Sequence, residues 1–211
     1  EGYAAFGLPQ KPHNLPTSHL YHGIPTASPC VFSFAWVSSF RMTAAPAELR
    51  IDRPSVADGA ALWRIARESG SLDLNSSYSY LLWCRDFAGT SAVVRAEGGD
   101  AVGFVTGYVR PADPRTLLVW QVAVDAAYRG RGLAAALLDG LTARLMAERP
   151  ITAVETTITP GNTASERLFA SYAARHGAEV GREVLFGAGL FPDGPHDPEV
   201  LYRIGPLSRP R

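Results

Sequence analysis

The sequence contains few cysteines, no net charge and no long apolar run, and each absence excludes a class of protein. Two cysteines among 211 residues, Cys30 and Cys84, are too few for a disulfide framework, so we expect a reduced, cytoplasmic protein. The 20 basic residues balance the 20 acidic ones, and nothing in that balance indicates nucleic acid as a partner. Because no apolar run approaches the roughly 20 residues that span a bilayer, we also expect no membrane partner.

Lysine is almost absent, and its single occurrence at Lys11 marks a division of the chain near Met42. Residues 1–41 contain five prolines and only three charged residues. They have no helical or strand period beyond a short apolar run, so we expect them to lie outside the core. Met42 is the expected natural start, with residues 1–41 a disordered extension or a misassigned upstream translation, and residues 42–211 one domain. A signal peptide is the alternative, but the segment lacks a basic beginning.

The middle of the chain predicts a strand, a turn and a helix. Leu117–Val124 is apolar except for Gln121, as in a strand covered on both faces. Leucines then recur every fourth residue from Leu133 to Leu145, which is a helical period. Between them, the glycines of Arg129–Gly132 allow a tight turn. The free N–H groups of the first helical turn, the helix dipole and two guanidinium groups suit a pyrophosphate, whereas the alternative is a basic surface turn.

The other periodic segments predict an α/β fold with antiparallel strands early and a β-α-β crossover in the middle. Asp58 is expected to cap the first helix, and Gly98–Asp100 to form a hairpin turn. In the second helix we expect Tyr78, Leu81, Leu82 and Cys84 to face inward. The expected strands are 49–53, 91–97, 101–110, 151–158, 180–186 and 200–204, the further helices are 59–68, 77–87 and 162–176, and the expected loops are 111–115 and 187–198.

The spacing Arg129-x-x-Gly132-x-Ala134 resembles the Arg/Gln-x-x-Gly-x-Gly/Ala signature of the GNAT superfamily of acetyl-CoA-dependent N-acetyltransferases. It fits neither the dinucleotide fingerprint nor the P-loop. The resemblance covers about residues 49–205. It implies the acyl-CoA N-acyltransferase fold, in which a mixed, mostly antiparallel sheet has helices on both faces and a central strand pair splays apart around acetyl-CoA. It also implies a homodimer.

The same resemblance implies which residues hold acetyl-CoA. The central strand would bind the pantetheine arm through its backbone and polarise the thioester carbonyl, while the turn would bind the pyrophosphate. Asn162 would touch the cofactor, a role compatible with capping its helix. The implied cofactor-binding residues are Val122, Ala123, Val124, Arg129, Gly130, Arg131, Gly132, Leu133, Ala134 and Asn162.

One position departs from the superfamily pattern. Many members have a tyrosine that protonates the thiolate where this chain has Phe169. Tyr172 lies nearly one helical turn further on, and water or another tyrosine is the remaining candidate for the acid.

Three longer blocks, residues 72–87, 119–124 and 155–160, resemble the L-2,4-diaminobutyrate acetyltransferases of ectoine biosynthesis. The resemblance implies transfer of acetyl to the 4-amino group, giving N4-acetyl-2,4-diaminobutyrate, which ectoine synthase would use to make the osmolyte. Two alternatives stay open. One is an acetyltransferase for another small amine, and the other is a non-catalytic CoA-binding module.

Such a substrate carries two ammonium groups, so its pocket needs acidic side chains. Glu155 interrupts an apolar strand and is expected to be the general base, directly or through water, with a structural ion pair or an exposed edge position as the alternative. Asp73 is expected to anchor the second ammonium group, with a turn or capping role as the alternative. Trp120 is expected to form a wall over the substrate or a cation–π contact, unless it only packs in the core. The expected catalytic residues are Glu155, Asp73 and Trp120; Asn75, Tyr78 and Thr157 are expected to join them in binding substrate, and we expect no metal.

Overall fold

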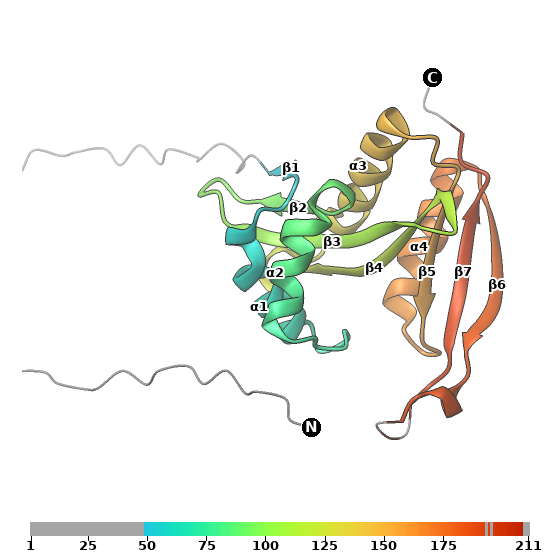
Figure 1. The fold of residues 1–211 in the computed structure, drawn as a ribbon. Coiled ribbons are helices and arrows are strands. Elements are labelled where there is room, and N and C mark those ends of the chain that lie inside the picture. The colour runs from blue at the N-terminus through green and yellow to red at the C-terminus, as the bar shows by residue number, and fades with distance from the viewer. Residues whose placement is uncertain (1–48, 193, 195, 209–211) are drawn as a thin grey trace, which may run out of the picture. The chain divides into compact units, whose positions relative to one another are not determined.

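The computed structural model describes residues 49–192, 194 and 196–208. In this part of the chain the fold is built on a mixed sheet of seven strands (Figure 1). The strand order is β1-β2-β3-β4-β5-β7-β6. Among these strands only β4 and β5 pair in parallel, so the predicted mostly antiparallel sheet is confirmed. The strands are β1 (Arg50–Asp52), β2 (Ala92–Arg95), β3 (Ala101–Arg110), β4 (Asp113–Val124), β5 (Ala153–Ile158), β6 (Glu179–Phe186) and β7 (Glu199–Gly205).

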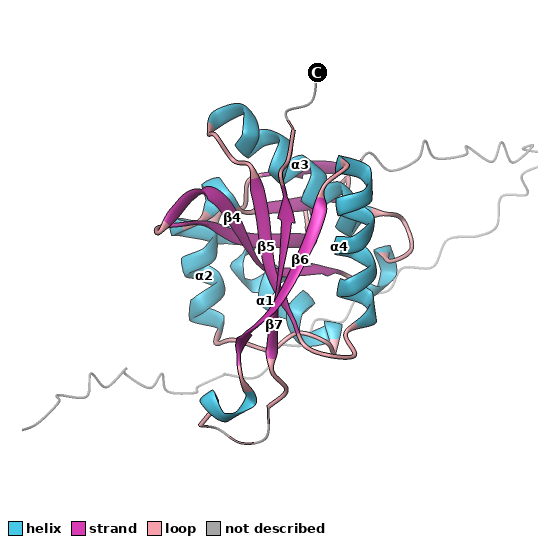
Figure 2. Ribbon diagram, turned by 90° about the vertical axis from the view of Figure 1, so that its right-hand side faces the viewer, coloured by secondary structure: helices cyan, strands magenta, loops and turns pink. Residues whose placement is uncertain are grey.

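In the described part of the chain, four α-helices cover the two faces of the sheet (Figure 2). Their bounds are α1 (Gly59–Ser69), α2 (Ser77–Asp86), α3 (Leu133–Glu148) and α4 (Thr163–His176). Helices α1 and α2 pack on one face, and α3 and α4 on the other. Helix α3 makes the crossover between the parallel strands β4 and β5, as the sequence predicts.

Each face has its own hydrophobic core. Leu137, Leu141 and Leu145 of α3 are fully buried against the sheet, which confirms the four-residue leucine period. On the opposite face, Leu62 of α1 packs in a smaller cluster with Phe104 of β3. The sheet is therefore fixed on both sides in the region of β2 to β4, which gives the central strand a rigid position.

Three local predictions are wrong: the loop at 111–115, the inward face of α2 and, as described below, the cap at Asp58. The loop expected at 111–115 is mostly strand, because Arg110 pairs directly with Asp113 and the hairpin turn is correspondingly short. In α2 Cys84 is buried as predicted, but Tyr80 is buried in place of Tyr78, which is 66% exposed. Two apolar stripes on this helix could face the core. The stripe that includes Tyr80 does so because the Tyr80 ring packs edge-on against Phe104.

Two predictions concern residues outside those that the structure describes: the character of residues 1–41, and Met42 as the natural start of the protein. Within the part of the chain that the structure does describe, no helix is both long and apolar enough to cross a membrane.

Cys84 is buried, and burial raises the pKa of its thiol to about 11.

Asp58 lies at the start of α1, but its side chain makes an ion pair instead of the predicted cap. Arg95 of β2 donates to both carboxylate oxygens at 2.7 and 2.9 Å, and the backbone N–H of Ser55 donates to one of them at 2.7 Å. Burial alone would raise the pKa of Asp58, but these hydrogen bonds hold the pKa below its usual 3.8. The pair therefore ties α1 to the sheet.

Asp58→Asn is expected to lower the free energy of unfolding by about 2 kcal/mol at neutral pH, because a bidentate, charge-assisted contact is lost. Since the folded pKa is depressed, this contribution is present above pH 3.8 and is lost as the pH falls below that value. Urea unfolding at several pH values measures it. Asp86→Asn, in an exposed pair with the neighbouring Arg85, is the control and should change little. An equal loss of unfolding free energy in both variants would contradict the stabilising role of the Asp58–Arg95 pair.

Candidate active site

The central strands β4 and β5 separate toward their carboxyl ends. Their pairing begins at Thr116 with Ala153 and stops at Val119 with Thr156. Beyond that point β4 continues to Val124, paired with β3 on its other side. No described strand pairs with the β5 side of this last part of β4, so this part of the strand can pair with a ligand instead, although the Val124 carbonyl already accepts from the Arg129 side chain. The splayed strand pair implied by the family resemblance is confirmed.

A cavity of about 270 Å³ lies beside the end of β4. It is formed by four separate segments: the loop after α1, the end of β4, the turn before α3 and the start of α4. The structure thus brings together six of the residues expected to bind acetyl-CoA. The lining residues are Ser69, Ser71, Leu72, Val122, Ala123, Val124, Arg129, Ala134, Asn162, Ala164, Ser165 and Leu168.

The turn before α3 has the conformation that its glycines allow. Gly130 and Gly132 have φ values of 76° and 73°, in the left-handed region that side chains disfavour. Arg129 lines the cavity, and its Nε donates to the carbonyl of Val124 at 3.2 Å. Arg131 instead lies 5.0 Å above the ring of Tyr128. The two guanidinium groups therefore differ in position, and the expected contacts of Gly130, Arg131, Gly132 and Leu133 with the cofactor stay predictions.

At the start of α4, Asn162 combines the two roles that the sequence allows. Its Oδ1 accepts from the backbone N–H of Ser165 at 3.1 Å, which caps the helix, and the residue also lines the cavity. Further along α4, Phe169 and Tyr172 are both buried in the core. Burial raises the pKa of Tyr172 to about 12, and its fully buried side chain does not reach the cavity, so we assign it no role as the thiolate acid.

Trp120 is pushed out of the regular strand by a bulge in β4. Thr106 pairs with Gln121 and Gly107 pairs with Val119, so Trp120 has no partner on β3. Gly107 is needed at the bulge, since a Cβ there would lie 2.6 Å from the carbonyl oxygen of Leu118. The Trp120 side chain is 50% exposed and lies 5.6 Å from the ring of Trp83 on α2. Trp120 therefore does not simply pack in the core, and its position suits the expected role as a wall over the substrate.

Gln121 connects the two sides of the site, a role that the sequence did not reveal. The residue is buried; its Oε1 accepts from the Tyr80 hydroxyl at 3.1 Å, and its Nε2 donates to the Asp73 carbonyl at 2.9 Å. The strand expected to bind the donor therefore also fixes the loop that carries Asp73. The available signal was Gln121 itself, the one polar residue in the otherwise apolar run Leu117–Val124.

Glu155 is buried in the sheet between two arginines. Arg110 of β3 donates to Oε2 at 2.9 Å, and Arg203 of β7 donates to Oε1. Both carboxylate oxygens are thus engaged, as the ion-pair alternative predicts. The role of general base stays a prediction, and it would require one guanidinium group to move away first.

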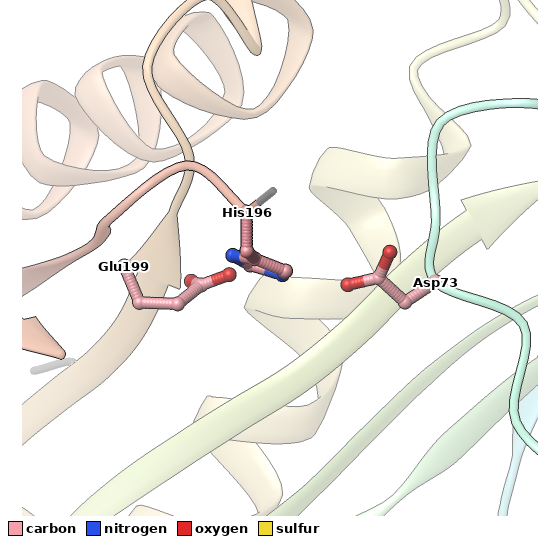
Figure 3. Close-up of side chains that lie close together, drawn as sticks. All are labelled: Asp73, His196 and Glu199. Atoms are coloured by element: carbon pink, nitrogen blue, oxygen red, sulfur yellow. The ribbon is translucent and has the colours of Figure 1, made fainter. Parts of the chain in front are cut away.

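A second group of ionisable side chains lies beside the α1–α2 loop (Figure 3). Asp73 from that loop, His196 from the β6–β7 loop and Glu199 at the start of β7 bring ligand-type atoms within 4.8 Å of one another. Oxygen and imidazole ligands of this kind could hold a metal ion or a cationic amine. His196 and Glu199 were missed because they lie more than a hundred residues from Asp73, in a loop without a periodic pattern and at the start of the strand that follows it.

The remaining expected substrate residues are spread over the same side of the sheet. Tyr78 is exposed on α2. Asn75, half-buried in the loop before α2, hydrogen-bonds to Tyr80 and opposes the burial that raises the pKa of that tyrosine. Thr157 is half-buried on β5, opposite Leu201 of β7. Their contacts with substrate stay predictions.

Comparison with known proteins assigns this geometry to a family. The model of the acetyltransferase (GNAT) family matches residues 60–173. The L-2,4-diaminobutyric acid acetyltransferase of Streptomyces avermitilis is 77% identical over 163 residues, which cover 77% of this chain and 91% of that protein. Its counterpart from Streptomyces coelicolor is 74% identical, with 79% and 98% covered. This chain belongs to the L-2,4-diaminobutyric acid acetyltransferases of the GNAT family.

Solved structures agree with this family. The diaminobutyrate acetyltransferase from Paenibacillus lautus, in complex with its substrate L-2,4-diaminobutyric acid and coenzyme A, is 41% identical to this chain. The two match with a TM-score of 0.72 over 79% of this chain and 99% of that one. Ard1 from Thermoplasma volcanium, at 21% identity and a TM-score of 0.59, covers 74% of this chain and 97% of its own and shares the fold.

In this diaminobutyric acid acetyltransferase family member, Arg129→Gln is expected to weaken coenzyme A binding about tenfold or more, because a charge-assisted contact contributes roughly 1.5–3 kcal/mol. Arg85→Gln is the matched control, since its guanidinium group pairs with Asp86 on α2 and does not line the cavity, and it should weaken binding less than threefold. Isothermal titration calorimetry with coenzyme A measures both. Equal weakening by the two substitutions would contradict the assignment to Arg129.

Proposed function

We propose that the protein transfers acetyl from acetyl-CoA to the 4-amino group of L-2,4-diaminobutyrate, giving N4-acetyl-L-2,4-diaminobutyrate, in the cytoplasmic pathway to ectoine. The observation that carries the proposal is the cavity at the end of β4, with an acidic side chain beside it. The cavity supplies a site for the acyl donor, and Asp73 supplies a charge for a cationic acceptor. The substrate and coenzyme A bound by the Paenibacillus lautus relative support the same pair of ligands.

The donor half of the reaction depends on the backbone. We propose that the pantetheine arm lies along Val122–Val124, where β4 lacks a partner on its β5 side, and hydrogen-bonds as an added strand would. An N–H near Val124 then polarises the thioester carbonyl, which lowers the barrier by roughly 3 kcal/mol in comparable oxyanion sites. The pyrophosphate lies at the turn before α3, where backbone N–H groups and Arg129 face it.

The acceptor half depends on charge and on an aromatic wall. Asp73 binds the 2-ammonium group, and its position is fixed through the Gln121 side chain. The half-exposed ring of Trp120 covers the aliphatic part of the substrate and offers its face to an ammonium group. In the proposal, Asn75 from the loop before α2, Tyr78 from α2 and Thr157 from β5 complete the acceptor pocket.

Acceptor selectivity tests the function directly. We expect kcat/KM for L-2,4-diaminobutyrate to exceed that for ornithine, lysine and putrescine by at least tenfold each, because a single methylene changes binding by about 1–3 kcal/mol. Thiol release measures the rate, and NMR of the product identifies the acetylated nitrogen. Preference for another amine would support the first alternative. Coenzyme A binding with no turnover of any amine would support a non-catalytic module.

We also propose that the protein is a homodimer that pairs through β6. All eight residues of this edge strand are exposed, and Val184 and Phe186 are 63% and 46% exposed. An edge strand with this much apolar surface offers both backbone hydrogen bonds and hydrophobic area to a second copy.

Val184→Lys is therefore expected to shift the protein toward monomer in sedimentation equilibrium, since a charge at the edge opposes strand pairing. Val56→Lys provides the matched control, because Val56 is similarly exposed but lies before α1, away from β6. A parent protein that is monomeric at micromolar concentration, or a dimer that both variants leave intact, would contradict pairing through β6.

A further inference from the structure

A carboxylate lies at the turn that is expected to bind an anion. Asp125 directly follows β4 and is the only acidic residue in the stretch 114–138 of the sequence. Its carbonyl accepts from the N–H of Tyr128 at 2.9 Å, and its Oδ1 accepts from the N–H of Ala127 at 3.1 Å, so the residue begins the short turn that leads to Arg129. A negative charge at this position opposes the binding of a pyrophosphate, because like charges repel.

A guanidinium group from α1 pairs with this carboxylate. Nη1 of Arg64 donates to Oδ2 of Asp125 at 2.8 Å, and the same nitrogen donates to the exposed Glu68, one helical turn further on, at 2.9 Å. The Asp125 side chain is 18% exposed, so its charge is only partly screened by water. Neither Arg64 nor Asp125 is among the residues that line the cavity at the end of β4. The pair therefore acts on a bound ligand through residues that do line the cavity.

Arg129 is the second cation that Asp125 attracts. Hydrogen bonds from Arg64 and from the Ala127 N–H hold the pKa of Asp125 below its usual 3.8, the first most strongly. The charge of Arg129 acts in the same direction, so the two groups are near enough to attract each other. Arg129 nevertheless keeps a different partner: among the described residues, its side chain donates only to the Val124 carbonyl, at 3.2 Å. The two terminal nitrogens of its guanidinium group are thus left for a ligand.

Resting on the proposed function for the identity of the ligand, we propose that Arg64 is a positioning residue of the donor site. It neutralises Asp125 and so leaves the Arg129 guanidinium group available to the pyrophosphate of acetyl-CoA. Without Arg64 the carboxylate is uncompensated, repels the pyrophosphate and draws Arg129 away from the cavity. The Asp125 side chain also holds the turn through the Ala127 N–H, and an asparagine can fill that capping role without a charge.

Calorimetric titration of the full chain with coenzyme A tests this role. Arg64→Gln is expected to raise the Kd about fivefold or more, because a negative charge near the ligand is no longer neutralised. Arg64→Lys should stay within about twofold of the parent, since a single contact from one nitrogen requires mainly the charge. Glu68→Gln is the matched control, because it removes the other partner of the same arginine, and it should also stay within about twofold.

Removal of the carboxylate separates neutralisation from any other role of Arg64. The double variant Arg64→Gln/Asp125→Asn is expected to return the Kd to within about twofold of the parent, and Asp125→Asn alone should have an equally small effect. A double variant that binds as weakly as Arg64→Gln would show that Arg64 does not act through Asp125 and would overturn the proposal. Weakening by Asp125→Asn as large as that by Arg64→Gln would make the pair a mechanical tie between α1 and the turn, which also overturns it.

Salt provides a readout that a purely structural role would not change. The ratio of the Kd of Arg64→Gln to that of the parent should fall toward one when NaCl is raised from about 0.05 to about 0.5 M, because salt screens partly exposed charges. A ratio that salt leaves unchanged would refute neutralisation as the cause. Circular dichroism and urea unfolding of Arg64→Gln establish that the variant is folded at both salt concentrations.

Steady-state kinetics with acetyl-CoA and L-2,4-diaminobutyrate connect this binding to the reaction. Arg64→Gln is expected to raise KM for acetyl-CoA about fivefold or more and to leave kcat and the KM for the amine within about twofold, because the pyrophosphate is bound equally in the ground and transition states. A fall in kcat with an unchanged KM for acetyl-CoA would overturn the proposal. A parent that binds coenzyme A but acetylates no amine would refute the proposed function, and the titrations would still decide the role of Arg64.

Discussion

The separation of β4 from β5 is the constraint on which the rest of the site depends. Two parallel strands that stayed paired would satisfy their backbone groups and leave no opening, whereas here pairing ends at Val119 and Thr156. Packing of helices on both faces keeps the strands in place despite the lost hydrogen bonds. Because Gln121 lies on the part of β4 beyond this pairing and binds the Asp73 carbonyl, the same part of the strand fixes the loop that carries Asp73 beside the cavity.

The parts predicted from the sequence are those that local pattern determines. The leucine period from Leu133 to Leu145 fixed the buried face of α3, and the run from Leu117 to Val124 identified the central strand. The turn between them was predicted to bind a pyrophosphate because its glycines and arginines directly precede a helix. Asn162 was predicted to cap α4, and it does. Each of these depends on neighbours within a few residues, so each is visible in one chain.

The parts that could not be predicted depend on contacts between distant segments. The two arginines that hold Glu155 come from strands on either side of it, and no spacing in the sequence relates them. His196 and Glu199 reach Asp73 only after the whole sheet has formed. The inward face of α2 was wrong because either stripe satisfies a helical period, and only packing against Phe104 selects Tyr80.

Amide hydrogen exchange of the protein with and without coenzyme A tests most directly whether the opening between β4 and β5 binds the donor. The account predicts slower exchange on binding in residues 121–134, in residues 69–72 and at the start of α4, because these segments line the cavity. It predicts no change in β6, which lies at the far edge of the sheet. Unchanged exchange at Val122–Val124, with protection appearing elsewhere, would contradict it.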